Sequence, residues 1–430
     1  MDVQTKQQRI AELARRMPNE SFKSLNHYID MEWLHEAYRR TRKGVAAGVD
    51  EVSSEEYEQR LEENLSSLLD RLKSGSYYAP AVKRGYVPKG GKSKEMRPIG
   101  IPTFEDKVLQ RAIHMVLEPI FESDFLDCSY AFRPKRSAHQ AIERLWRVTS
   151  SFRECYVLEV DMRKYFDTLK HEHLRIFYKQ RVCDGVITRV LGKWLKAGVM
   201  EDGMISYPED GTPQGGVISP LLSNIYLHEV LDKWFETEIK PRLRGRSELV
   251  RFADDFTLVF EVKSDAERVT AVLAKRLERF GLTIHPDKTR LIDFSSPKGK
   301  GGSTNTFDFL GFTHYWGKSR YGKWIPKRKT AKDRLKRSIR KVHLWCKTNR
   351  HEPVAMQWKT LCRKVQGHYN FFGVTFNSRS VNMFFEQIKR SWRKWLDRRN
   401  REKHMTWEKY NRLLEKYPLP RPRIMHSYVA

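Results

Sequence analysis

The positive charge of this chain is concentrated in its carboxyl-terminal part, and this asymmetry limits how the chain can fold. Residues 313–430 hold 31 lysines and arginines but only 7 aspartates and glutamates, a net charge of +24 out of +28 for all 430 residues. Seven of the eleven tryptophans lie in the same segment, whereas a solvated tail would hold few aromatic residues. The segment is therefore predicted to fold as a basic domain. Its self-repulsion favours a nucleic acid as partner over a membrane surface or an acidic protein.

The rest of the composition is typical of a folded cytoplasmic protein. Hydrophobic residues make up 40% of the chain, and the length allows two or three domains. No apolar run reaches the 18 residues of a membrane span, and the first residues, MDVQTKQQRIAELARRM, lack the apolar centre of a secretory signal. The five cysteines include no CxxC pair. We therefore expect free thiols, with neither a zinc site nor a disulfide framework.

Hydrophobic periodicity predicts a mixed α+β chain. Apolar residues recur at helical spacing at about 1–75, 104–121, 137–148, 168–196 and 264–280. CYVLEVD (155–161) is a short apolar run typical of a buried strand. The lysine and arginine runs at 327–341 and 389–401 are predicted to lie along helices. Charge and periodicity both change near 312–330, so the main domain boundary is predicted there.

RFADDFTLVF (251–260) places two adjacent carboxylates, Asp254 and Asp255, between apolar runs. A hairpin turn is one explanation, since aspartate is common in turns. Asp161 offers another, because it ends the apolar run 155–160. If that strand lies beside the hairpin, Asp161 and Asp254 face each other across one sheet edge. Two Mg²⁺ ions about 4 Å apart would then assist an in-line displacement at phosphorus, with Asp254 as direct ligand and Asp255 as its support.

Several sequence blocks occur in the order found in reverse transcriptases. They are Asp161 with Phe166 five residues later, PQGG (213–216), FADD (252–255) and FDFLGF (307–312). RPIGIPTFEDKVLQRAI (97–113), SYAFRPKRSAHQAI (129–142) and GTPQGGVISPLLSNIYLHEVLD (211–232) resemble more narrowly the enzymes encoded by bacterial group II introns. The resemblance implies a right-hand polymerase, with fingers and an antiparallel palm sheet followed by an all-helical thumb and maturase (RNA-binding) region. The implied bounds are 1–150 for the N-terminal extension and fingers, 151–312 for the palm and 313–430 for the thumb and maturase region.

The resemblance also implies roles for individual residues. The implied catalytic residues and metal ligands are Asp161, Asp254 and Asp255, with the backbone carbonyl of Met162 as a further ligand. The implied nucleotide-binding residues are Lys89, Arg97, Phe166, Gln214 and Lys288. The implied template or primer contacts are Arg133, Gly215, Gly216, Phe252 and Gly311.

Some of these residues have plain structural explanations as well. Lys89 and Arg97 supply the point charge and the forked guanidinium that suit a triphosphate, or they belong to a solvated basic turn. Phe166 would act as a steric gate against a ribose 2′-hydroxyl, or it is an ordinary buried aromatic residue. Lys288 would lie near the leaving pyrophosphate, with a general-acid role, or it faces solvent.

By this resemblance the chain is an RNA-directed DNA polymerase that adds dNTPs to a primer 3′-hydroxyl with two Mg²⁺ ions. Its implied partners are structured intron RNA as template, a DNA primer or target DNA, and dNTPs, with roles in intron splicing and retrohoming. The implied location is the bacterial cytoplasm, in association with the nucleoid or with ribonucleoprotein. Three alternatives remain open: a domesticated relative acting in DNA repair, phage defence or CRISPR spacer acquisition; an RNA-binding splicing factor without polymerase activity; and a metal-dependent nuclease.

The sequence departs from the family pattern at two places. Phe252 stands where the family commonly carries tyrosine beside the primer end. The printed sequence ends in PRPRIMHSYVA, without the cysteine pairs and the histidine-rich motif of the HNH endonuclease that many relatives append. Second-strand cleavage is therefore not expected from this polypeptide. The sequence leaves the oligomeric state open between monomer and dimer.

Overall fold

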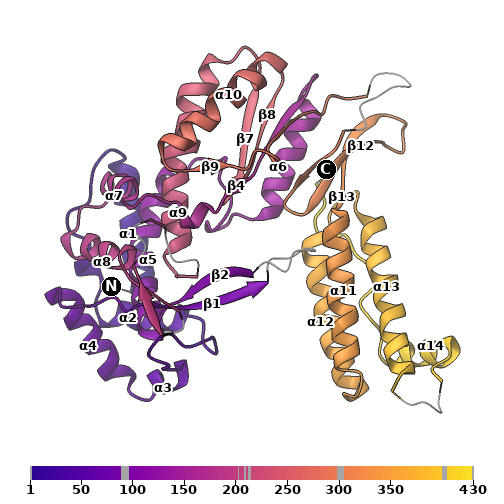
Figure 1. Cartoon of the computed structure of the whole chain (residues 1–430), viewed down its shortest axis with the longest axis horizontal. Coiled ribbons are helices and arrows are strands. Elements are labelled where there is room, and N and C mark those ends of the chain that lie inside the picture. Colours follow the sequence, from indigo (N-terminus) through magenta and orange to yellow (C-terminus); the bar gives the residue numbers. More distant parts are fainter. Residues whose placement is uncertain are drawn as a thin grey trace.

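The structure, a computed structural model, describes residues 2–88, 96–201, 203–207, 210–211, 215–297, 305–399 and 404–428. Three parts follow one another across the view in Figure 1. They are a helical N-terminal lobe, a central sheet with its covering helices, and a helical C-terminal bundle.

The N-terminal lobe is built around one long helix. It contains α1 (Val3–Arg16), α2 (Met31–Arg40), α3 (Ser54–Glu58), α4 (Leu61–Ser74), α5 (Phe104–Asp124), α7 (His171–Lys179) and α8 (Gly185–Leu195). Helices α1, α2 and α3 pack on α5, whose apolar residues are almost entirely buried. Local capping explains where several helices begin, because the side chains of Asp2, Asp30 and Thr103 accept hydrogen bonds from backbone N–H groups of the first turns of α1, α2 and α5.

A small sheet joins sequence segments on either side of the predicted boundary at residue 150. Its order is β2 (Met96–Ile101), β1 (Val82–Pro88), β5 (Val199–Glu201), β6 (Met204–Ser206). β1 and β2 are antiparallel, whereas β1 and β5 are parallel. The segment that contains α8, β5 and β6 therefore packs with the N-terminal lobe, although it lies within the range 151–312.

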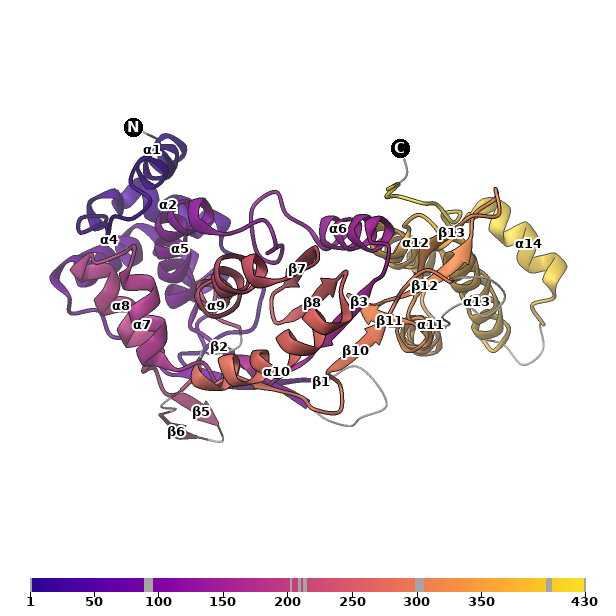
Figure 2. The ribbon, with the colours of Figure 1, turned by 90° about the horizontal axis from the view of Figure 1, so that it is seen from above.

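The central sheet has the order β10 (Arg290–Asp293), β3 (Tyr156–Val160), β8 (Asp255–Phe260), β7 (Ser247–Phe252), and every neighbouring pair is antiparallel. The two central strands, β3 and β8, are buried on both faces, which is why their sequences are nearly continuous apolar runs. Leu158 and Leu258 face the core of the N-terminal lobe, while Val157 and Val259 face the other side. Helices α9 (Ser219–Leu227) and α10 (Lys263–Arg279) cover the first face and α6 (Ala138–Ser151) the second, as Figure 2 shows for α10 and α6. A two-stranded pair, β4 (Met162–Arg163) and β9 (Thr283–Ile284), extends one end.

The prediction that the region after residue 312 is all-helical is wrong for its first part. β11 (Phe307–Phe309), β12 (Phe312–Lys318) and β13 (Trp324–Thr330) form an antiparallel sheet before the first helix of the bundle. The alternation expected of a strand is hard to see in the sequence of β13, because a basic residue, Arg328, occupies an inward-facing position. Arg328 and Thr330 point inward while Lys327 and Lys329 do not. The predicted helix over 327–341 begins only at Lys332.

The C-terminal bundle has its own apolar core. Its helices are α11 (Lys332–Thr348), α12 (Val354–Phe372), α13 (Ser378–Asp397) and α14 (Trp407–Lys416). Trp392 and Tyr410 are fully buried in it, which accounts for part of the tryptophan content of the basic segment. Among the helices that the structure describes, none combines the length and the apolar character needed to span a bilayer.

Arg328 lies where the bundle meets α6. It is fully buried, and its guanidinium stacks on the ring of Tyr428 at 4.3 Å and on that of Trp146 at 5.7 Å. Trp146, on α6, also donates from Nε1 to the carbonyl of Pro326 at 2.9 Å. We call this cluster the Arg328 joint; it holds β13, the tail of the chain and α6 together.

Candidate active site

The two aspartates of FADD lie at the turn between β7 and β8, which we call the FADD turn (252–255). Phe252 pairs with Asp255, so Ala253 and Asp254 form the tip. Ala253 has φ +58°, in the left-handed region that a two-residue hairpin turn requires. The hairpin predicted from the sequence is therefore present, and the turn residues include both candidate ligands.

Asp161 reaches the same edge of the sheet from the neighbouring strand. β3 pairs with β8 in a register that places Val160 opposite Phe256. The next residue along β3, Asp161, therefore follows at the end where Asp255 begins β8. Strand register, rather than sequence proximity, brings these carboxylates to one edge.

Arg251 lies behind the FADD turn and was not singled out from the sequence. Its side chain and that of Asp232 are both fully buried, with Nε donating to Oδ1 at 2.7 Å and Nη2 to Oδ2 at 2.5 Å. Nη1 donates to the carbonyl of Ala253 at 3.2 Å and to Asn224 Oδ1 at 3.1 Å, and Nη2 donates to Ser129 Oγ at 2.8 Å. One buried guanidinium thus fixes the backbone of the turn.

Burial and neighbouring charge change the pKa values of the turn carboxylates. Desolvation raises the pKa of Asp254. Desolvation, followed by the charges of Asp254 and Asp161, raises the pKa of Asp255 to about 6, although this residue is exposed to solvent. The charge of Arg97 opposes both shifts, and that of Arg334 opposes the shift of Asp255. Clustered oxygen donors that repel one another fit a divalent cation, which would neutralise them.

Lys288 contacts one of these carboxylates. Its Nζ lies 2.8 Å from Asp161 Oδ2, and the backbone N–H of His285 donates to the Asp161 carbonyl at 2.7 Å. Across the described residues, no three acidic, histidine or cysteine side chains are already grouped as a metal site. The cationic partner that Asp161 has here is therefore the ammonium of Lys288.

A cleft of about 280 Å³ opens beside the carboxylates. Asp161, Asp255 and Lys288 line it together with Gly311 and Arg334. Gly311 has φ +81° at the β11–β12 turn, and its carbonyl accepts from the N–H of Ala331 at 3.0 Å, just before α11 begins. The FDFLGF block thus forms a wall of the cleft, as expected if it approaches a nucleic-acid strand.

Two residues of this cleft, Asp308 and Arg334, were missed by the sequence analysis. Asp308 lies inside the FDFLGF block, so its position in a recognised motif was an available signal. Arg334 belongs to the basic run 327–341, where nothing in the sequence separates it from the other cations.

Two buried polar side chains and a close backbone contact fix residues 215–217, which include the glycines of PQGG. A Cβ atom on Gly215 would lie 2.5 Å from the carbonyl oxygen of Gly100, so the backbones approach too closely for a side chain there. Gln110 Oε1 accepts from the N–H of Val217 at 2.7 Å, and its Nε2 donates to Asp106 Oδ2 at 2.9 Å. Burial raises the pKa of Asp106 to about 6. Gln110 and Asp106 therefore position the backbone at Val217 from inside the N-terminal lobe.

The other residues with predicted nucleotide, primer or metal contacts differ in burial, and two of them lie outside the described residues. Phe166 is half-buried against the main core, and its carbonyl oxygen would lie 2.9 Å from a Cβ on Gly211. A Cβ on Gly216 would meet the side chains of Ser219 and Gln110. Phe252 is half-buried and packs on the α6 side of the central sheet, in the apolar cluster that contains Val157 and Val259. Lys89 and Gln214 lie outside the described residues, so their nucleotide-binding roles stay predictions, as does the metal-binding role of the Met162 carbonyl.

The structure corrects the role expected for Arg133. Its side chain is only 3% exposed and forms an ion pair with Glu122 at 2.8 Å. Its guanidinium also donates to the carbonyls of Phe125, Leu126 and Ser129 at 3.2, 2.6 and 2.9 Å. Every nitrogen is thus used inside the protein, and Arg133 anchors residues 131–136, which we call the AFRPKR loop, rather than presenting a charge to a template.

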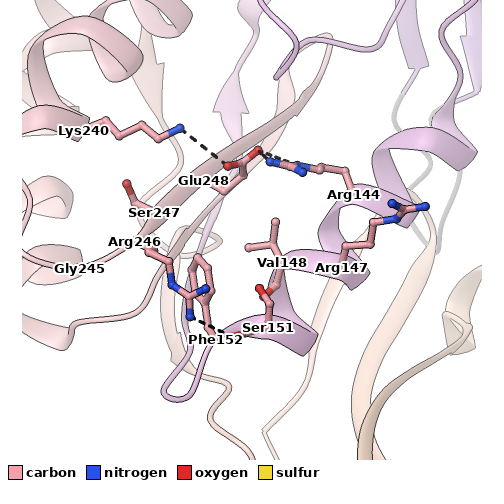
Figure 3. A pocket seen from close by; sticks show the side chains of 10 residues that line it. All are labelled: Arg144, Arg147, Val148, Ser151, Phe152, Lys240, Gly245, Arg246, Ser247 and Glu248. Atoms are coloured by element: carbon pink, nitrogen blue, oxygen red, sulfur yellow. Dashed lines mark hydrogen bonds and ion pairs between the residues drawn. The ribbon is translucent and has the colours of Figure 1, made fainter.

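A second hollow, of about 450 Å³, lies at the β7 edge of the central sheet (Figure 3). Its cations already have acidic partners, with Arg144 at 2.6 Å and Lys240 at 3.8 Å from Glu248, and Arg246 at 2.8 Å from Glu261. It contains none of the predicted site residues. We assign the chemistry to the cleft beside Asp161 and Asp255 instead.

Comparison with known proteins decides the family. The family described as "Reverse transcriptase (RNA-dependent DNA polymerase)" matches residues 87–314. This range is more than half of the chain and contains β3, β7 and β8, which carry the candidate carboxylates, and the FDFLGF turn. The chain belongs to the reverse transcriptases.

Relatives place it within that family. Protein YkfC of Escherichia coli strain K12 is 36% identical over 329 residues, which cover 68% of this chain and 82% of YkfC. Group II intron-encoded protein LtrA of Lactococcus lactis subsp. cremoris is 36% identical over 243 residues, which cover 56% of this chain but 39% of LtrA. Nuclear intron maturase 2, mitochondrial, of Arabidopsis thaliana is 28% identical over 274 residues, 53% of this chain and 36% of that protein. The chain is a reverse transcriptase of the group II intron and maturase type, and its enzyme class is RNA-directed DNA polymerase.

Proposed function

We propose that the carboxylates of Asp161, Asp254 and Asp255 carry two-metal synthesis of DNA on an RNA template. In this proposal the N-terminal lobe and its small sheet are the fingers, the central sheet is the palm, and the C-terminal bundle is the thumb and maturase region. The observation that carries the proposal is the strand register, which brings carboxylates from β3 and from the β7–β8 turn to one edge, beside a cleft, in a chain of the reverse transcriptase family.

The residues around the cleft suit this reaction. Two Mg²⁺ ions, when bound, would supply stabilisation of the attacking and leaving oxygens. Asp161 would hold a cation where it now pairs with Lys288, and the Lys288 ammonium would neutralise the leaving pyrophosphate. Arg97, whose charge lowers the pKa of both Asp254 and Asp255, would bind the nucleotide phosphates. Phe166 would exclude a ribose 2′-hydroxyl beside them.

The RNA side of the proposal rests on charge and on the relatives. The C-terminal bundle carries most of the net charge of the chain, so phosphate contacts would dominate its affinity for RNA and make that affinity depend steeply on salt. The names of LtrA and of the Arabidopsis protein tie relatives to introns. Structured intron RNA is therefore the proposed partner, with splicing and retrohoming as the proposed roles. The intact carboxylate set favours this function over RNA binding alone.

The test is primer extension on poly(rA)/oligo(dT) with dTTP and Mg²⁺. The unaltered protein is expected to extend the primer, and Asp254→Ala is expected to abolish extension while leaving RNA affinity within a few-fold. Asp70→Ala, which removes an exposed carboxylate on α4, is the matched control and should extend normally. Extension by Asp254→Ala at the unaltered rate would refute the metal assignment.

A further inference from the structure

Phe132 combines two unfavourable features that packing does not explain. Its backbone has φ +56°, in the left-handed region that is sterically poor for a residue with a bulky side chain. Its side chain is also exposed, with 57% of the residue surface accessible to solvent. Strained non-glycine residues persist only where the surrounding structure enforces them, and they cluster at functional sites.

The surrounding structure does enforce this conformation. Arg133, the next residue, is pinned through Glu122 and three main-chain carbonyls. Lys135 is also left-handed, with φ +60°. Arg136 pairs with Asp127 and stacks on the ring of Tyr130 at 5.5 Å. The exposed aromatic ring is therefore displayed by a rigid loop and is not the result of a frayed segment.

The segment that carries Phe132 is hydrogen-bonded to the strand and the arginine that support the FADD turn. The backbone N–H of Tyr130 donates to the Arg251 carbonyl at 3.0 Å, and the Arg251 N–H donates to the Cys128 carbonyl at 2.8 Å. Asn224 connects the two parts as well, since its Nδ2 donates to the Ala131 carbonyl at 2.8 Å and its Oδ1 accepts from Arg251. Phe132 is thus carried by the segment that packs directly behind the catalytic hairpin.

The charge around Phe132 favours a nucleic acid as its partner. The AFRPKR loop contains three cationic residues and no acidic one. Lys135 is exposed beside Phe132, so a phosphate could be neutralised while a base or sugar lies on the ring. Rings next to cations are the usual platform for unpaired bases, because every base offers a face for stacking.

We infer that Phe132 is a nucleic-acid contact, whose ring stacks on a base or sugar of the template–primer held at the neighbouring cleft. This inference rests on the proposed polymerase function and deepens it, because it replaces Arg133 with Phe132 as the residue of this loop that touches the strand. Arg133 then serves as the anchor that keeps the ring outside.

The experiment measures the Kd of a fluorescein-labelled RNA template–DNA primer by anisotropy, in 150 mM salt and without dNTP. Phe132→Ala is expected to weaken binding roughly fivefold or more, as expected for the loss of one base–aromatic contact. Phe132→Trp keeps an aromatic ring and should bind within about twofold of the unaltered protein. Ile176→Ala, which removes an exposed apolar side chain from α7, is the matched control and should not change Kd.

A third variant separates contact from folding. Phe132→Gly loses the same ring as Phe132→Ala but is free of the left-handed strain, so it should melt at a higher temperature while binding equally weakly. Unchanged Kd in Phe132→Ala, or equal weakening in Phe132→Trp, would overturn the inference. A change of oligomeric state in Phe132→Ala at constant Kd would also overturn it, because the ring would then make a protein contact.

The same measurements separate this inference from the proposed function. If the unaltered protein binds and extends primers while Phe132→Ala behaves identically, the inference fails and the polymerase proposal stands. Failure of the unaltered protein to extend any primer refutes the polymerase proposal itself.

Discussion

The FADD turn and the AFRPKR loop each contain a non-glycine residue with positive φ within two residues of a buried arginine. Ala253 is held by Arg251, and Phe132 is followed by Arg133. The anchors differ in their surroundings. Arg251 is paired with a carboxylate that is fully buried, whereas the carboxylate paired with Arg133, on Glu122, is 27% exposed and the main chain supplies the other acceptors. The turn that carries the proposed catalytic carboxylates is therefore fixed from inside the core, and the loop that carries the aromatic ring is fixed near the surface.

Removing the anchor of the FADD turn should have the largest effect on stability. Arg251→Met leaves Asp232 buried without its charge partner, so the free energy of unfolding should fall by about 3–5 kcal/mol. Chemical denaturation measures this change. The double variant Arg251→Met/Asp232→Leu should recover most of the loss, because no lone charge stays buried. A single variant as stable as the unaltered protein would contradict the comparison.

The corresponding change in the AFRPKR loop should cost less. Arg133→Met deprives three carbonyl groups of a donor, but Glu122 can still reach water, so a loss of about 1–3 kcal/mol is expected. Denaturation under the same conditions gives the value. Arg136→Met is the control, since its partner Asp127 is 93% exposed and the pair should contribute at most about 1 kcal/mol. A loss for Arg133→Met as large as that for Arg251→Met would remove the distinction between the two anchors.

The FADD turn should respond to pH, whereas the AFRPKR loop carries no carboxylate. Asp255, with its pKa raised to about 6, takes up a proton as pH falls through that value. Because a proton competes with a divalent cation, the Mg²⁺ concentration for half-maximal extension should rise about fourfold between pH 7.5 and pH 5.5. The raised pKa also means that the contribution of Asp255 to stability is present below its unfolded value near 3.8 and is lost as pH rises through about 6.

The control for this pH titration is the affinity of the protein for template–primer, measured without Mg²⁺ at the same two pH values. Its dependence on Phe132 should be the same at both pH values, because the ring does not titrate. An unchanged Mg²⁺ requirement would show that Asp255 does not contribute to the cation site.

The smallest expected effect is relief of strain in the FADD turn. Ala253→Gly removes the cost of a left-handed alanine but adds freedom to the unfolded chain, so a gain of at most about 1 kcal/mol in unfolding free energy is expected. Thermal denaturation detects it, and primer extension should slow because the carboxylates are held less firmly. A loss of stability would mean that the turn is not strained, and the parallel with Phe132 would fail.

The meeting of the strand ends that carry Asp161 and Asp254 could be foreseen, because local sequence patterns encode those strand ends. An apolar run that ends in Asp161 and a hairpin pattern around Asp254 define strand ends, and antiparallel pairing then brings them together. The glycines of PQGG were expected to let the backbone approach the template or nucleotide; the close approach that the structure shows for Gly215 is to Gly100, and it could not be read from the sequence.

The anchor of the FADD turn could not be foreseen, because the partners of Arg251 come from distant segments. Arg251 meets Asp232 and Ser129, which are separated from it by 19 and 122 residues. Within the AFRPKR loop, nothing local shows that Arg133 turns inward while Lys135 stays outside. The strands after residue 312 were missed for another reason, because a buried Arg328 between the half-buried Lys327 and the exposed Lys329 follows the charge pattern of a solvated helix.

The Arg328 joint implies that the polymerase core and the basic bundle stay connected when nucleic acid leaves. Stacking of a buried guanidinium on aromatic rings is shielded from dissolved ions, unlike phosphate contacts on an open surface. Concentrated salt should therefore remove the RNA that we propose the bundle binds, without loosening the attachment of the bundle to α6, so that the protein released in a high-salt wash is already assembled for the next template.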